Sequence, residues 1–392
     1  MELKPKSKKR QKRKPRKSSN RNWLSKLPTC DDELMDALYE SYIMARRKKT
    51  KTNDEFSFEV NWMENLQQLA EDIVTRKYKP SRSKAFITRV PVIREIFAAP
   101  FRDRIIHHLL YAVVAPWWEK RFVPSSFSCR VGKGTDYGAE TLQKMMRRAT
   151  RNGMVKAIVI KGDFSGYFMS MKRDILYEKV MWGLERQFPE KGWLYDLCAY
   201  LWKEVIYDDP TVGVRLASKR RDWIDLPLNK SLFHQPAGQG IVIGNLTSQL
   251  LSNIMLNEFD WWMKCTLGFR FYGRYVDDFY IVVPEGDYGY AMAVMQEVVP
   301  SYVEKIGLRL HPDKRYVQDT TKGCPFLGKK VFMDYMLLGD RIKKNAGKRL
   351  REFVNKGVDY DGIVSYIGMT KYVKAKKFLH AEIEKVGGRF RY

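Results

Sequence analysis

Residues 269–284 have the sequence FRFYGRYVDDFYIVVP, in which two runs of strand-forming residues flank a pair of aspartates. Aromatic and β-branched residues are enriched in strands, so the runs 269–276 and 279–284 each predict a strand. The two aspartates are the only residues between the two runs. The stretch therefore predicts a β-hairpin that carries Asp277 and Asp278 at its turn.

An earlier stretch, MVKAIVIKGDF over residues 154–164, predicts another apolar strand, which ends in Asp163. If this strand is a neighbour of the hairpin, Asp163 converges with Asp277 and Asp278. Carboxylates at close range repel one another, so such a cluster is most stable when a cation bridges it. Three carboxylates suit two divalent ions about 3.5–4 Å apart, the arrangement that stabilises attacking and leaving oxygens in phosphoryl transfer. Mg²⁺ is the expected metal, because it needs few carboxylates and leaves sites for phosphates.

Helical patterns lie between these strands, around residues 174–206 and 248–263. A further apolar helix is predicted over residues 101–119, ending near Pro116. A basic helix is predicted after Gly339. Strands and helices are thus intermixed around an antiparallel sheet, and the expected fold class is α+β.

The other acidic and histidine pairs are better explained by structure than by catalysis. Asp208-Asp209 is followed by Pro210 and by no strand, which predicts a loop. Asp31-Asp32 precedes a helical pattern, where acids favour the first turn. His107-His108 lies on the predicted helix, and neighbouring side chains point about 100° apart there, so a structural role is favoured over a metal site.

The charge of the chain points to a polyanionic partner. Lysine and arginine number 71 against 45 aspartates and glutamates, which gives a net charge of +26. Residues 1–22 carry eleven of the basic residues and one glutamate, so a disordered basic arm is expected there. Nucleic acid is the expected partner, with a membrane surface as the weaker alternative.

The apolar and cysteine content indicates the cellular compartment that is expected for the protein. No stretch approaches the ~20 apolar residues of a membrane span. The five cysteines are scattered and include no CxxC pair, which favours a reducing compartment over disulfides or structural zinc. A cytoplasmic protein that does not bind a membrane is expected.

The segment Tyr275–Asp278 between two apolar strands resembles the YxDD box of reverse transcriptases. Asp163 and the residues up to Phe168 resemble the first catalytic motif of that family. Further segments in the family's order, from about residue 86 to 370, strengthen the resemblance: REI (94–96) with PFRDRIIHHLLY, SCRVGKGT (128–135), GIVIGNLTSQLLSNIMLNEFD (240–260), LRLHPDK (308–314), FLG (326–328) and SYIGM (365–369).

The resemblance implies a right-hand polymerase with fingers, palm and thumb. It divides the chain into the basic arm (1–22), the fingers with an N-terminal helical extension (23–155), the palm (156–335) and a small helical thumb (336–392). Residues of about 170–240, within the palm range, are expected to add elements to the fingers.

For the chemistry, the resemblance implies that Asp163, Asp277 and Asp278 hold two Mg²⁺ ions, for which Mn²⁺ can substitute. The Phe164 carbonyl is expected to be a backbone ligand. Lys314 is expected to protonate the leaving pyrophosphate, or alternatively to contact a phosphate.

For the nucleotide, the resemblance implies that the amides of Gly166 and Tyr167 face the triphosphate and that Phe168 excludes a ribose 2′-hydroxyl. Arg94, and less surely Arg89, would clamp phosphates, although Arg94 could equally be a solvated strand residue. The remaining expected site residues are Ile243, Gly244 and Gln249 at the nucleotide, and Phe326, Leu327 and Gly328 at the primer end.

Two details resemble one subgroup, the reverse transcriptases of diversity-generating retroelements. Ile243-Gly244 stands where most of the family has Gln-Gly, and Ser248-Gln249 where most has Ser-Pro. The subgroup implies a template RNA, a primer or cDNA strand, dNTPs and a small basic accessory protein as partners, with errors opposite template adenines. A faithful retron- or group II intron-like enzyme, and a non-catalytic basic RNA-binding protein, stay as alternatives.

Overall fold

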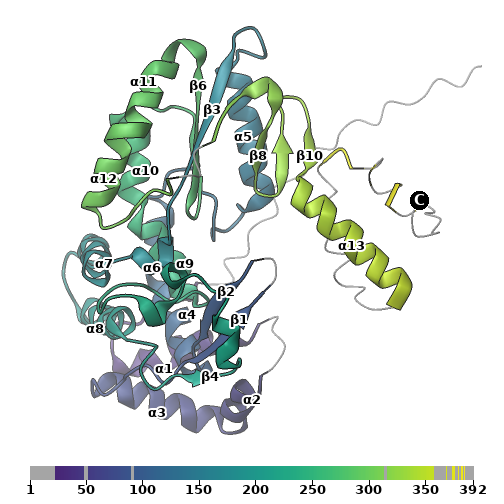
Figure 1. The fold of residues 1–392 in the computed structure, drawn as a ribbon. Helices are drawn as coiled ribbons and strands as arrows, with labels where there is room; N and C mark the ends of the chain where they lie inside the picture. Colours follow the sequence, from purple (N-terminus) through teal and green to yellow (C-terminus); the bar gives the residue numbers. More distant parts are fainter. Residues whose placement is uncertain are drawn as a thin grey trace, which may run out of the picture.

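The computed structural model describes residues 23–47, 52–89, 92–312 and 316–356, together with isolated positions between 368 and 384. Helices and mainly antiparallel sheets are intermixed, which confirms the expected α+β class (Figure 1). The basic arm at 1–22 and most of the predicted thumb lie outside the described residues. The predicted domain boundaries therefore stay predictions.

The central sheet has the strand order β5-β6-β3-β7, and every neighbouring pair is antiparallel. The sheet explains why the sequence of its middle strand is apolar without alternation. In β6, Phe279, Ile281 and Val283 belong to the larger core, whereas Tyr280 and Val282 face a smaller core on the other side. A strand that is buried on both faces needs no polar face, and the apolar run FYIVV without alternation fits this position. The strands are β3 (Ala157–Asp163), β5 (Tyr272–Tyr275), β6 (Asp278–Pro284) and β7 (Tyr316–Asp319).

Helices cover both faces of this sheet (Figure 1). On one side lie α10 (Asn257–Trp261), α11 (Tyr288–Ala293) and α12 (Val299–Lys305). On the other side lies α5 (Thr135–Ala149), whose apolar residues Leu142 and Met146 complete the smaller core.

A second layer of helices surrounds a small sheet of order β2-β1-β4. The sheet consists of β1 (Lys84–Thr88), β2 (Arg94–Ala98) and β4 (Arg215–Leu216). The helix α4 is almost wholly buried and joins this layer to the central sheet through α9. The helices are α1 (Asp31–Arg46), α2 (Asn53–Val60), α3 (Trp62–Val74), α4 (Phe101–Glu119), α6 (Tyr167–Ser170), α7 (Arg173–Gln187), α8 (Trp193–Tyr207) and α9 (Leu246–Met255).

A third sheet, of order β10-β9-β8, stands beyond α5 and leads into the basic helix α13 (Figure 1). Its antiparallel strands are β8 (Cys324–Phe326), β9 (Lys329–Val331) and β10 (Met336–Leu338). The helix α13 (Asp340–Lys356) confirms the helix predicted after Gly339.

The structure corrects three sequence predictions. Helix α4 continues through Pro116 to Glu119, because a proline in the last turn removes only one of the final backbone hydrogen bonds. The pattern at 248–263 is divided between α9, α10 and a wider π-helical turn at Trp262–Thr266. Asp278 is the first residue of β6 and not a turn residue.

The predictions for two of the acidic pairs are confirmed. Asp208 follows the end of α8 in a loop, and Asp31 and Asp32 lie in the first turn of α1. All five cysteines are free. None of the helices in the described ranges has both the length and the apolar character of a membrane span.

Candidate active site

The hairpin predicted from the sequence forms between β5 and β6, with Tyr275 paired to Asp278. Two residues, Val276 and Asp277, make the turn. Val276 has a φ of 57°, which is a strained conformation for a β-branched residue and one that short hairpin turns usually give to glycine. The turn therefore needs support from its surroundings, because this strain costs on the order of 1–3 kcal/mol.

Arg274 supplies that support from a fully buried position. Its Nη1 donates to the Val276 carbonyl at 2.9 Å, while Nε and Nη2 donate to the two carboxylate oxygens of Asp260, each at 2.7 Å. Tyr272 donates to the same carboxylate. Burial by itself lowers the pKa of Arg274, but the adjacent Asp260 carboxylate outweighs burial and raises it, so the guanidinium stays charged. This pair was not predicted from the sequence, where its only signal is an arginine inside an apolar strand.

The register of β3 and β6 brings the predicted carboxylates together. Asp163 and Asp278 are direct cross-strand partners at the end of the antiparallel pair. The Phe164 amide donates to the Asp277 carbonyl at 3.2 Å, which holds the third acidic residue beside the first strand. The three aspartates are half-buried at one edge of the central sheet.

The donor set fits a hard divalent cation, because carboxylate oxygens are the ligands that Mg²⁺ prefers. Like charges directly opposite each other on two strands are destabilising, so Asp163 and Asp278 need a compensating cation. Lys161 provides part of the compensation, with Nζ 3.0 Å from Asp278 Oδ2. Within the described residues, no group of three or more histidine, cysteine or acidic side chains already has a metal-holding arrangement. The Mg²⁺ site thus stays a prediction.

The segment that begins at Leu308 lies along the first motif. The Ser165 amide donates to the Arg309 carbonyl at 2.8 Å, and the His311 amide donates to the Asp163 carbonyl at 2.7 Å. Phe164 and Leu310 form an isolated bridge between the two segments. The segment that leads to Lys314 is therefore next to Asp163, but Lys314 itself lies outside the described residues.

The residues after Asp163 form a tight turn into α6. Gly166 adopts a left-handed conformation with φ of 56°. Tyr167 is buried, and its hydroxyl donates to the Ser252 carbonyl at 2.5 Å; burial raises the pKa of this phenol. Phe168 is half-buried, and its carbonyl accepts from the Ile241 amide at 2.9 Å. This contact places the loop before α9 beside the predicted steric gate.

That loop carries Ile243 and Gly244. Ile243 packs against a small cluster that includes Phe97 of β2 and Leu232. Gly244 has a φ of 132°, and a Cβ there would lie 3.2 Å from the Phe97 carbonyl, so the close approach to β2 favours glycine. Gln249 is exposed on α9.

The two predicted phosphate clamps lie on or next to the small sheet. Arg94 is exposed at the start of β2 and pairs with Thr88 across the strands. Arg89 is half-exposed and forms ion pairs with Asp225 at 2.8 Å and with Asp222 at 3.7 Å. No contact of the described residues joins Arg89 to the three aspartates.

The predicted primer-end segment forms the tight hairpin between β8 and β9. Leu327 and Gly328 both have positive φ, at 50° and 77°, as a two-residue hairpin turn with the twist of its strands requires. Lys161 links this hairpin to the carboxylates, because its Nζ also donates to the Pro325 carbonyl at 3.2 Å. Sequence reasoning did not single out Lys161, whose spacing of two residues before Asp163 puts both on one face of β3.

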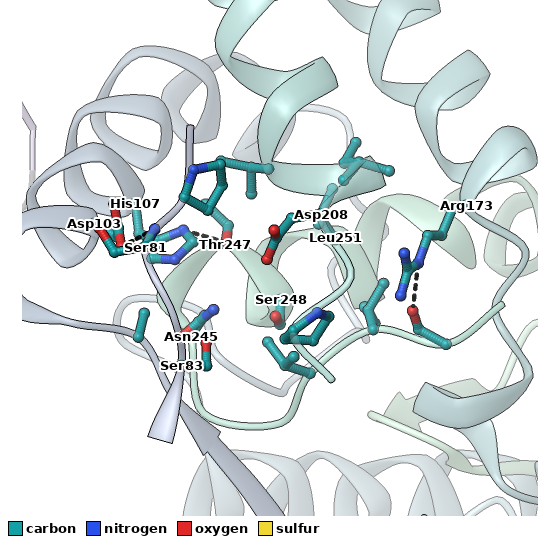
Figure 2. A pocket seen from close by; sticks show the side chains of 18 residues that line it. Ser81, Ser83, Asp103, His107, Arg173, Asp208, Asn245, Thr247, Ser248 and Leu251 are labelled. Carbon is teal, nitrogen blue, oxygen red and sulfur yellow. Dashed lines mark hydrogen bonds between the residues drawn. The ribbon is translucent and has the colours of Figure 1, made fainter. Parts of the chain in front are cut away.

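A small pocket with both polar and apolar lining residues lies behind the loop that carries Ile243 (Figure 2). Its volume of about 40 Å³ has room for a few water molecules. His107 and Thr247 are hydrogen-bonded at 2.9 Å on one wall, and burial lowers the pKa of His107 to about 3, which keeps the ring neutral. The expected structural role of His107 fits this contact.

The acids of the pocket are Asp103 and Asp208. Asp103 accepts from the Tyr78 hydroxyl at 3.0 Å and the Ser81 amide at 2.8 Å, and burial raises its pKa. Burial, together with the charge of Asp103, raises the pKa of Asp208 to about 6. Arg173, also buried, donates to the Gly240 carbonyl at 3.0 Å and ties α7 to the same loop. The pocket supports the loop from behind and is lined by none of the three aspartates at the sheet edge.

Comparison with known proteins gives distant likenesses. No protein-family model matches the chain. It is similar to Protein YkfC of Escherichia coli (strain K12), with 24% identity over 303 residues that cover 68% of this chain and 71% of that protein.

Among solved structures, the chain is similar to one in the structure of telomerase from Candida albicans in complex with the TWJ fragment of telomeric RNA. The TM-score is 0.48 and the identity 12%, with coverage of 85% of this chain and 58% of that chain. The chain thus spans less than two thirds of the telomerase chain. Because these likenesses assign no family, the function has to be argued from the geometry at the sheet edge.

Proposed function

We propose that this protein is an RNA-directed DNA polymerase, which copies a template RNA into cDNA by nucleotidyl transfer. The observation that carries the proposal is the direct pairing of Asp163 with Asp278 beside the strained Val276-Asp277 turn. Structural acids rarely face one another across a strand pair, because the repulsion is destabilising. A supported, strained turn at the same edge is typical of a functional site.

Asp163, Asp277 and Asp278, with the Phe164 carbonyl, would hold two Mg²⁺ ions. Bound there, the ions would activate a primer 3′-hydroxyl and stabilise the charge on a triphosphate. Lys161 holds Asp278 in place and lowers the repulsion of the cluster. The hairpin at Leu327-Gly328, tied to Lys161 through Pro325, would position the primer end.

The incoming dNTP would lie between the sheet edge and β2. The amides of Gly166 and Tyr167 and the guanidinium of Arg94 would contact its phosphates. Phe168 would exclude a ribose 2′-hydroxyl, which favours DNA synthesis over RNA synthesis. Lys314 would donate a proton to the pyrophosphate.

The finer proposal is the error-prone enzyme of a diversity-generating retroelement. Ile243 cannot donate the hydrogen bond that a glutamine could make to the nucleotide, and one such bond is worth about 0.5–1.5 kcal/mol. Its loss would reduce base discrimination by up to roughly tenfold. A structured template RNA and a small basic accessory protein of the same element are the proposed partners.

The test is cDNA synthesis from a defined RNA template with a DNA primer, Mg²⁺ and dNTPs. The wild-type chain should extend the primer, and Asp277→Asn should lower the rate at least about a hundredfold, because each metal ligand contributes several kcal/mol to the transition state. Asp287→Asn is the matched control, because Asp287 is an exposed acid in a surface turn and should be dispensable.

Sequencing the cDNA separates the alternatives. Errors concentrated opposite template adenines support the diversity-generating enzyme, whereas faithful cDNA favours the retron- or group II intron-like enzyme. If no cDNA forms even with cognate RNA and accessory protein, or if Asp277→Asn is as active as the wild type, the proposed two-metal polymerase is wrong and a non-catalytic RNA-binding protein becomes the better explanation.

A further inference from the structure

A row of tryptophan and arginine side chains crosses the surface formed by α7, α10 and the end of α4. The order along the surface is Trp261, Arg121, Trp117, Trp182 and Arg186, and we call it the Trp–Arg row. In Figure 1 the helices α7 and α10 lie on the side of the molecule away from α13 and the β8–β9 hairpin. None of the five residues belongs to the candidate active site.

Contacts along the first half of the row fix the side chains. The guanidinium carbon of Arg121 lies 3.3 Å from the centre of the Trp117 ring, and its Nη1 donates to the Trp117 carbonyl at 3.0 Å. The indole Nε1 of Trp261 donates to the Arg121 carbonyl at 2.7 Å. Trp261 is nevertheless 41% exposed.

The second half repeats the arrangement. The Trp117 and Trp182 rings are 6.2 Å apart and nearly perpendicular. The guanidinium carbon of Arg186 lies 4.0 Å from the centre of the Trp182 ring, and its Nη1 donates to the Trp182 carbonyl at 3.2 Å. Trp182 is 40% exposed. Each arginine is thus held over an indole ring by a backbone hydrogen bond, so little side-chain entropy remains to be lost when a ligand binds.

The row has an excess of positive charge. Lys120 follows Trp117 on the same turn and is exposed. Among the ion pairs of the described residues, none involves Lys120, Arg121 or Arg186, whereas three nearby acids are paired with other cations, as the contacts Glu258–Lys179, Glu119–Arg130 and Glu185–Lys191 show. Three cations therefore remain for an anionic partner.

We propose that the Trp–Arg row binds a single-stranded segment of nucleic acid away from the candidate active site. Unpaired bases stack on guanidinium planes and on indole rings, and the same cations neutralise the phosphates between them. A buried protein interface would have to desolvate these three cations, which is costly. The proposal goes beyond polymerisation, since it needs neither the aspartates nor a metal ion.

The test measures binding of a fluorescent oligouridine to the full-length chain in EDTA, over a range of salt concentrations. The double variant Arg121→Gln/Arg186→Gln should bind more weakly and should lower the slope of log K against log salt by about 1.4, since each neutralised phosphate contributes about 0.7. Trp182→Leu should weaken binding about fivefold or more, because it removes a stacking surface. Circular dichroism checks that each variant is folded.

Arg76→Gln is the matched control, because Arg76 also lies over a ring, that of Tyr200 at 4.7 Å, and also donates to a carbonyl, but belongs to no tryptophan row. Arg76→Gln should leave the slope of log K against log salt near the wild-type value. Wild-type affinity and slope in the double variant would overturn the proposal. An equal loss of affinity for duplex RNA in the double variant would also overturn the proposal, because the row would then bind through its charge and not through stacking on unpaired bases.

The outcome of the oligouridine-binding test is independent of the proposed polymerase activity. Oligouridine binding is measured without metal, so it can be present when cDNA synthesis fails. Conversely, primer extension on a short annealed template–primer should be unchanged in Arg121→Gln/Arg186→Gln.

Discussion

At the residue scale, the pair of Asp260 and Arg274 decides whether the acidic turn can form. Both side chains are fully buried, and Arg274 also holds the carbonyl of Val276, whose conformation is strained. A buried charge without its partner is strongly destabilising, because the protein cannot replace the lost hydration. The strain at Val276 and the position of Asp277 therefore depend on a side chain that is not one of the predicted metal ligands.

We expect Arg274→Met to lower the free energy of unfolding by about 3–5 kcal/mol, since it leaves the Asp260 carboxylate buried without its cation. Chemical denaturation measures the change. The double variant Asp260→Leu/Arg274→Met should recover part of this loss, because both charges are gone. A single variant as stable as the wild type would show that the pair is not what holds the turn.

Asp208 is a residue whose proton is coupled to stability. Its pKa of about 6 in the folded protein lies above the ordinary value of 3.8, through burial and the nearby charge of Asp103. The folded state thus binds the proton more tightly than the unfolded state does. The stabilisation is complete below about pH 4 and is lost as the pH rises through about 6.

We expect Asp208→Asn to be stabilised relative to the wild type at pH 7.5 and not at pH 4. The gain should be about 1 kcal/mol, less than the full shift implies, because Asp208 is partly exposed. Thermal unfolding of both proteins across this pH range measures it. A difference that does not grow with pH would exclude Asp208 as the titrating group.

At the scale of elements, two glycines on the neighbouring strands β3 and β5 make room for large side chains of β6. Gly162 of β3 lies opposite Phe279, and Gly273 of β5 lies opposite Tyr280. A Cβ at either glycine would come within 2.5 Å of the facing ring. Each ring therefore lies over the bare backbone of a neighbouring strand, and this packing adjoins Asp163 and Asp278.

We expect Gly162→Ala to cost about 1–3 kcal/mol, because the added methyl forces the Phe279 ring out of its position. Since Phe279 follows Asp278, primer extension should fall together with the melting temperature. Gly286→Ala is the control, because a Cβ there meets no atom within 4 Å. Equal stability of the two variants would mean that the ring can move at no cost.

At the scale of the whole molecule, we expect the net charge to govern the proposed association with nucleic acid. The basic arm at 1–22 supplies +10 of the net charge of +26, and the rest is spread over the remaining chain. Counterion release makes such binding depend steeply on salt and little on sequence.

We expect deletion of residues 2–22 to weaken RNA binding at low salt and to reduce the salt slope by about 0.7 for each phosphate that the arm neutralises. The extension of a pre-annealed template–primer at saturating concentration should change little, because the deletion removes none of the three aspartates of the sheet edge. Filter binding at several salt concentrations gives the slope. An unchanged slope would show that the arm does not bind nucleic acid.

The local pattern of the sequence predicted three strands of the central sheet (β3, β5 and β6), several of the helices and the three aspartates. The prediction of these strands needs only the period and composition of short segments. Such segments are the two apolar runs around Asp277 and Asp278 and a third that ends at Asp163. The end of α4 and the division after α9 were misplaced for the same reason. Pro116 has a low helix propensity, but in the last turn of α4 it removes only one of the final backbone hydrogen bonds.

Only the tertiary structure decided which groups meet. The register that places Asp163 opposite Asp278, the ion pair of Arg274 with Asp260 and the contact of Lys161 with Asp278 join residues 14 to 117 positions apart. Such pairings depend on the packing of both faces of β6 and on the hydrogen bonds that buried charges require. No local pattern encodes them, because each partner is satisfied only when the other strand or helix has already come into place.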